Sequence, residues 1–123
     1  MKIDWSLYLA AHSKATCDRL LQKIRDAGVE IVVVNAEPYS KGKSLIKVRG
    51  ESHVKAETIN EGYYSVMRKA NRLARTWSVT VPEGDGAWSF SAASNPGSVR
   101  IQGIESISFE ASSEPEEAGH LMR

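Results

Sequence analysis

Two histidines are the residues of this sequence whose type and position are best suited to chemistry. His12 opens the tetrapeptide His-Ser-Lys-Ala and His53 opens His-Val-Lys-Ala, and each tetrapeptide follows a predicted strand and precedes a predicted helix. Histidine titrates near neutral pH, so a pair of them could act as general acid and general base on a phosphodiester. Helix N-termini also favour anions, and Lys14 and Lys55 would add positive charge there. His12 and His53 are therefore the catalytic candidates, and the edge they would share is a candidate anion site.

This pair resembles the motifs of the two-histidine phosphoesterases, which carry His-x-Thr or His-x-Ser. The third position here holds Lys14 in one tetrapeptide and Lys55 in the other. The hydroxyl that helps those enzymes to hold the substrate phosphate is therefore missing from both motifs. A phosphodiester-processing enzyme is accordingly the least favoured of three functional hypotheses.

Basic residues form a second candidate site. Arg68, Arg72 and Arg75 follow one another at spacings of four and three residues on one face of a predicted helix. A solvated helix face explains part of this pattern, since arginine near a helix C-terminus interacts favourably with the helix dipole. The predicted third strand adds basic side chains, and a nearby tyrosine offers an aromatic anchor of the kind found in protein interfaces. We predict binding through Arg68, Arg72, Arg75, Lys47, Arg49 and Tyr39.

The composition excludes several functional classes. Of the 123 residues, 41% are apolar and 25% are charged, as in ordinary globular domains. The single Cys17 rules out an internal disulfide framework, and its place on the apolar face of a predicted helix assigns it to the core. No phosphate-binding loop, dinucleotide fingerprint or Gly-x-Ser-x-Gly nucleophile motif occurs. We predict no metal and no cofactor, and we expect a binding protein rather than an enzyme.

The order of the predicted elements is strand, helix, strand, strand, helix, and then several further strands. The predicted boundaries are strands 1–10, 30–35 and 45–49, helices 14–27 and 55–75, and strands near 76–81, 88–92 and 99–109, the last with a bulge or bend at Gly103. Apolar and polar residues alternate along the first strand, Ser13 is the predicted N-cap of the first helix, and Gly28 is the predicted glycine that ends it. Turns are predicted near residues 40–43 and 82–86. The pattern predicts the α+β class, with a ferredoxin-like β-α-β-β-α-β core, a strand-rich C-terminal extension and a mostly antiparallel sheet packed by two helices. We expect the first and third strands to be adjacent and parallel, which would bring His12 and His53 to one edge. The uniformly apolar strand 30–35 is expected to be central or covered on both faces.

Charge is unevenly distributed along the chain. Residues 1–82 carry a net charge of +6 and residues 83–123 a net charge of −5, which together give +1. We divide the chain into a single domain, 1–111, and an acidic flexible tail, 112–123. No signal peptide and no apolar run of membrane-spanning length is present, so a cytoplasmic protein without a membrane partner is expected.

These observations predict a non-enzymatic module that binds another protein and acts by occlusion, such as an inhibitor or an immunity or antitoxin-like protein. The alternative is a protein that binds nucleic acid or a phosphate ligand through the basic helix face and the edge at His12 and His53. Steep loss of affinity with salt would favour that alternative. Self-association through an unpaired strand edge stays open, because the C-terminal strands could leave one.

Overall fold

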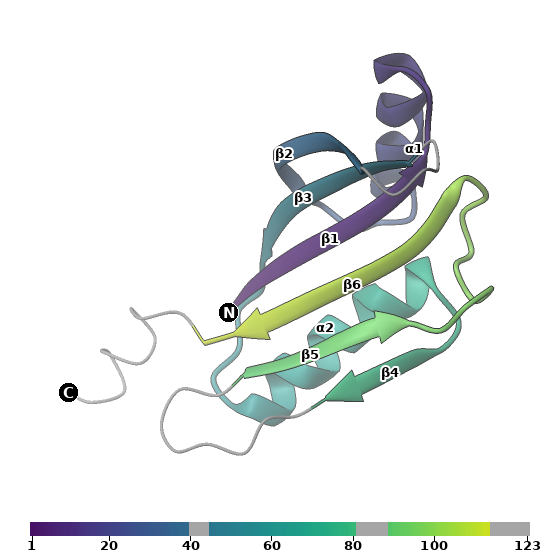
Figure 1. The fold of residues 1–123 in the computed structure, drawn as a ribbon. Helices are drawn as coiled ribbons and strands as arrows, with labels where there is room; N and C mark the ends of the chain where they lie inside the picture. The colour runs from purple at the N-terminus through teal and green to yellow at the C-terminus, as the bar shows by residue number, and fades with distance from the viewer. Residues whose placement is uncertain (40–44, 81–88, 114–123) are drawn as a thin grey trace.

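The computed structural model of the chain describes residues 1–39, 45–80 and 89–113. In these residues two helices lie on one face of a six-stranded antiparallel sheet (Figure 1). The elements along the chain are β1 (Lys2–Ala10), α1 (Lys14–Asp26), β2 (Val32–Tyr39), β3 (Leu45–His53), α2 (Ile59–Leu73), β4 (Trp77–Thr80), β5 (Ser89–Ser94) and β6 (Ile104–Ser112). The turns predicted near residues 40–43 and 82–86 lie outside the described residues. Of the predicted tail 112–123, Ser112 belongs to β6, and the residues from 114 onward lie outside the described part of the chain.

The strand order is β2-β3-β1-β6-β5-β4, and every neighbouring pair is antiparallel. The α+β class and the two-helix layer are confirmed, but the order differs from the ferredoxin-like arrangement. There the strand after the second helix lies beside the first strand, whereas here β4 lies at the far edge and β6 occupies that place (Figure 1). The nine-residue β6 can pair along the whole of β1, while β4, with four residues, suits an edge.

Alternation in β1 decides which face of the sheet is buried. Its odd-numbered positions, from Ile3 to Leu9, point to the helices, and its even-numbered positions point to the opposite, uncovered face. Both helices pack apolar side chains against the buried face, and these include Cys17, Leu20, Leu21 and Ile24 from α1 and Val66, Ala70 and Leu73 from α2. The predicted core position of Cys17 is therefore confirmed.

The ends of α1 follow the predicted local signals. The Ser13 hydroxyl accepts a hydrogen bond from the Thr16 backbone N–H at 3.2 Å, which caps the first turn. Gly28 follows the helix with a φ of +89°, a left-handed conformation that costs glycine little. The second helix is shorter than predicted, because Thr58 caps its start and the helix ends at Leu73.

Two strand predictions are wrong. The last strand does not begin near Val99 but at Ile104, directly after the predicted bend at Gly103, and Val99 forms only an isolated bridge with Ala74. The third strand does not end at Gly50 but continues to His53, because a residue without a Cβ leaves room there for the side chain of Ile31.

The second strand is neither central nor covered on both faces. β2 is an edge strand, and Val32, Val33 and Val34 are all exposed. A physical reason lies in the widths of the two layers. Six strands span about 29 Å, whereas two helices of about 10–12 Å diameter cover roughly 20–24 Å. The helix layer therefore leaves part of the sheet bare, and β2 lies in that part.

Candidate functional site

The two histidines lie at opposite ends of the sheet's central strand. Because β1 and β3 are antiparallel, His53 pairs with Lys2 at the start of β1, while His12 follows the end of β1. Nine residues of strand separate them by roughly 25–30 Å. The prediction that the two histidines share an edge is wrong. β3 lies between β1 and β2 and runs antiparallel to both, so its end lies beside the start of β1. His12 and His53 cannot act together on one phosphodiester.

The ridge of three arginines predicted on one face of the second helix, Arg68, Arg72 and Arg75, is present only in part. Arg68 and Arg72 are exposed on the side of α2 that faces away from the sheet, whereas Arg75 lies beyond the helix and its backbone N–H donates to Ser98 O at 2.9 Å. The Arg72 guanidinium donates to Gly28 O at 3.4 Å, which ties α2 to the residues after α1. The ridge on the helix therefore consists of Arg68, Lys69 and Arg72.

Tyr64 completes this surface and is a residue that sequence analysis missed. The Arg68 guanidinium lies 5.7 Å from the centroid of the Tyr64 ring, a cation–π geometry. Together with the three basic residues and Ser65, it lines a shallow hollow on α2. The signal in the sequence was the spacing of four residues between Tyr64 and Arg68, which places both on one helix face.

Two of the other predicted binding residues lie on the opposite side of the molecule. Lys47 and Arg49 belong to the uncovered face of the sheet, where Lys47 Nζ is 5.8 Å from the centroid of the Tyr8 ring. Arg49 is exposed opposite Ser6 and has no ion pair among the described residues. Tyr39 pairs with Leu45 at the end of β2. The six residues predicted to bind therefore do not form one surface.

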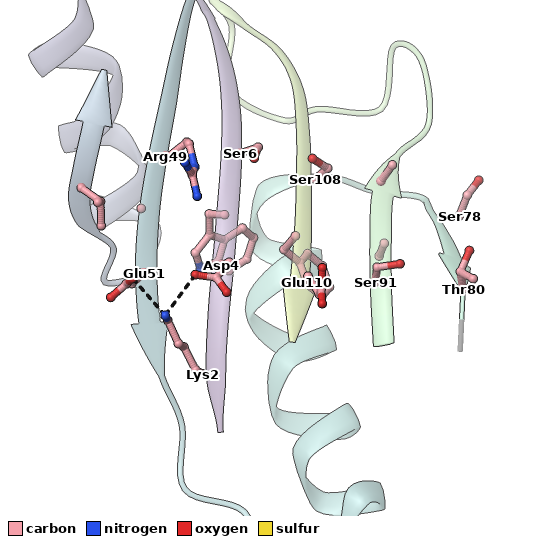
Figure 2. Close-up of a pocket in the computed structure, with 16 residues that line it drawn as sticks. Lys2, Asp4, Ser6, Arg49, Glu51, Ser78, Thr80, Ser91, Ser108 and Glu110 are labelled. Carbon is pink, nitrogen blue, oxygen red and sulfur yellow. Dashed lines mark ion pairs between the residues drawn. The ribbon is translucent and has the colours of Figure 1, made fainter. Parts of the chain in front are cut away.

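The uncovered face is a broad hollow of about 720 Å³ that runs across the sheet (Figure 2). Figure 2 shows two rows of side chains that cross the strands, and pairing partners define both. One row runs through Glu51, Asp4, Glu110, Ser91 and Thr80, and the other through Arg49, Ser6, Ser108, Ala93 and Ser78. Charged residues therefore gather over β3, β1 and β6, and small side chains over β5 and β4.

Three carboxylates stand next to one another in the first row. Asp4 pairs directly with Glu51 on one side and with Glu110 on the other, and like charges in such positions repel. Lys2 Nζ lies 3.1 Å from Glu51 Oε1 and 3.6 Å from Asp4 Oδ1. The hydrogen bond to Glu51, followed by the negative charge of Asp4, raises the pKa of Lys2. Glu110 has no ion pair in the described part of the chain. We call Asp4, Glu51 and Glu110 the carboxylate row.

The carboxylate row was missed by sequence analysis, although each member occupies a polar position of an alternating strand. Its members come from three separate segments of the chain, so only the strand order brings them together. The row is not a metal site by its geometry, since no group of three or more His, Cys, Asp or Glu side chains within residues 1–39, 45–80 and 89–113 is placed to hold an ion.

No helix within the described residues is long and apolar enough to cross a membrane. Comparison of the chain with protein-family models, with curated proteins and with solved structures gives no match.

Proposed function

We propose that this chain is a non-enzymatic protein-binding module that occludes its partner through the uncovered face of the sheet, in the manner of an inhibitor or an immunity protein. The observation that carries the proposal is the carboxylate row, in which three acidic side chains on neighbouring strands have one lysine between them. Such a row destabilises the fold, and a positively charged partner would relieve the repulsion.

The size of the face supports docking of a protein. Forty-five strand residues, each occupying about 3.3 Å by 4.8 Å, present roughly 700 Å². One side of a standard protein interface buries about 800 Å². One partner domain would therefore cover most of the sheet.

The chemistry of the face indicates what that partner presents. The carboxylate row repels phosphates and would receive lysine or arginine side chains, while Arg49 next to it would receive a carboxylate. Small side chains such as Ser6, Ser108 and Ser78 let the partner approach the backbone closely. A nuclease whose cationic surface was covered in this way would be inhibited, which is the immunity-type role.

The test is an affinity pull-down of the tagged chain from its native cell extract, with each sample divided into nuclease-treated and untreated halves. We expect the wild-type chain to recover one protein from both halves. Glu110→Lys should lose that protein, because it reverses a charge in the row, whereas Glu105→Lys should retain it. Glu105 is the matched control, since it lies on the same strand and outside the row. Equal recovery with both variants would contradict the proposal.

A second candidate function, binding of nucleic acid or a phosphate ligand, rests on the hollow on α2. Arg68, Lys69 and Arg72 surround it without an acidic partner among the described residues, and Tyr64 offers a ring for stacking. This function would be favoured if the wild-type chain recovers nucleic acid, if the double variant Arg68→Glu with Arg72→Glu does not, and if the recovered amount falls steeply as salt is added. If the same double variant instead recovers a protein from both the nuclease-treated and the untreated halves, binding through the sheet face is favoured.

A further inference from the structure

The outer edge of β2 is the part of the surface that the proposed function leaves unexplained. Within residues 1–39, 45–80 and 89–113, β2 pairs only with β3, so one of its edges has no strand beside it. Val32, Val33 and Val34 on this edge are 72%, 38% and 59% exposed. Consecutive exposed apolar residues on an unpaired edge favour pairing with another strand.

A groove of about 650 Å³ continues this apolar surface on the helix side of the sheet, between α1 and β2. Its lining is mostly apolar and includes Cys17, Leu21, Val33, Ala36, Pro38 and Ile46. Two basic and two acidic side chains also line it, namely Lys14, Arg25, Asp18 and Glu37. The β2 edge is therefore open at its side and underneath.

We propose that the occupant of this edge is a second copy of the chain, whose β2 pairs antiparallel with the first about a two-fold axis. The segment 31–36 contains no charged residue, so antiparallel pairing of two copies within it places no like charges opposite each other. In addition, the groove carries both signs of charge in equal number. A groove of one sign would repel its own copy, whereas this mixture allows basic groups of one α1 to approach acidic groups of the other.

The rest of the sheet favours a closed dimer over an open-ended filament. A two-fold interface uses the same edge in both copies and leaves none of it for a third. Pro38 cannot donate a backbone hydrogen bond, and the register of β2 shifts between Val33 and Asn35, so the pairable stretch is short. The opposite edge is β4, which has four residues in the described part of the chain. Both features limit further strand addition.

The measurement is sedimentation velocity of the full chain over a wide concentration series. We expect the wild-type chain to reach twice its mass of 13.5 kDa, and Val33→Lys to stay at the monomer mass because each copy would then bring a charged side chain into a pairing segment that is otherwise uncharged. Thr80→Lys is the matched control, since it adds the same charge to an exposed position of the opposite edge strand, and it should still dimerise. Far-UV circular dichroism and thermal unfolding establish that each variant is folded. Val34→Lys serves as the second variant if Val33→Lys does not fold.

A wild-type chain that stays at the monomer mass throughout would overturn the proposal, as would a folded Val33→Lys or Val34→Lys that dimerises like the wild type. Loss of the dimer in Thr80→Lys would also overturn it, because the interface would then lie elsewhere. Glu110→Lys should leave the mass unchanged. Failure of the dimer and failure of binding at the sheet face are therefore distinguishable.

Discussion

Replacing Glu110 with lysine exchanges a repulsive charge in the carboxylate row for an attractive one, and we expect the fold to become more stable. Paired positions on neighbouring antiparallel strands have Cβ atoms about 5 Å apart, which puts the Asp4 and Glu110 charges roughly 7 Å apart. At that separation two unit charges in water interact by about 0.6 kcal/mol. Screening over a Debye length of about 8 Å lowers this to about 0.3 kcal/mol at physiological salt, and reversing the sign gives a gain of about 0.5 kcal/mol.

Equilibrium unfolding in urea measures this gain. At low salt, where screening is weak, the gain should approach about 1 kcal/mol, and the urea midpoint should rise without a change in the slope m. The thermal midpoint should rise by about 4 °C under the same conditions. Glu105→Lys makes the same charge change on the same strand but outside the row, so it should gain less.

Three results would refute this reasoning. Glu110→Lys could be no more stable than the wild type at low salt, its gain could fail to shrink as salt is added, or Glu105→Lys could gain as much. Any of them would mean that the row is not under electrostatic strain. If instead Glu110→Lys is more stable and also loses its partner, the loss of binding cannot be attributed to unfolding.

Two further predictions concern the core. The Ser52 hydroxyl bridges two groups, because it accepts from the Trp5 indole N–H at 3.0 Å and donates to the Glu30 carbonyl. Ser52→Ala leaves both groups without this partner and should lower the free energy of unfolding in urea by about 1–3 kcal/mol. Ser108→Ala, on the exposed face, should be near neutral, and equal stability of the two variants would contradict the bridging role of Ser52. Burial, followed by the charge of Asp18, raises the pKa of the Cys17 thiol, so a smaller fraction of it is thiolate at any given pH. Its reaction with a disulfide reagent should therefore be slow at neutral pH and accelerate only in more alkaline solution. A pH–rate profile equal to that of free cysteine would count against this prediction.

Local features of the fold were predictable from the sequence because neighbouring residues determine them. Alternation identified β1 and the face that it buries, and the hydroxyl at Ser13 and the glycine at Gly28 identified the ends of α1. The core position of Cys17 followed from helical spacing alone. Each of these depends on contacts within a few residues along the chain.

Strand order was not predictable in this way, because it depends on pairing between distant segments. The predictions for β2 show the consequence: consecutive valines have the same local pattern in a buried strand and in an exposed edge strand. The histidine prediction failed for a related reason, since the direction of β3 relative to β1 is a property of the whole sheet. The carboxylate row could not be found until β3, β1 and β6 were known to be neighbours.

The central place of β1 has a consequence for how the chain is made. Lys2 pairs with Ser112, so β1, which precedes the other described strands in the chain, finds one of its two neighbours only when β6 has been synthesised. Until then β1 and β3 can pair, but the other side of β1 lacks β6 and exposes apolar residues meant for the core. Contacts this distant in sequence slow folding and lengthen the time during which unpaired strands can aggregate. Nascent chains that end before β6 should therefore depend on chaperones more than the finished protein does.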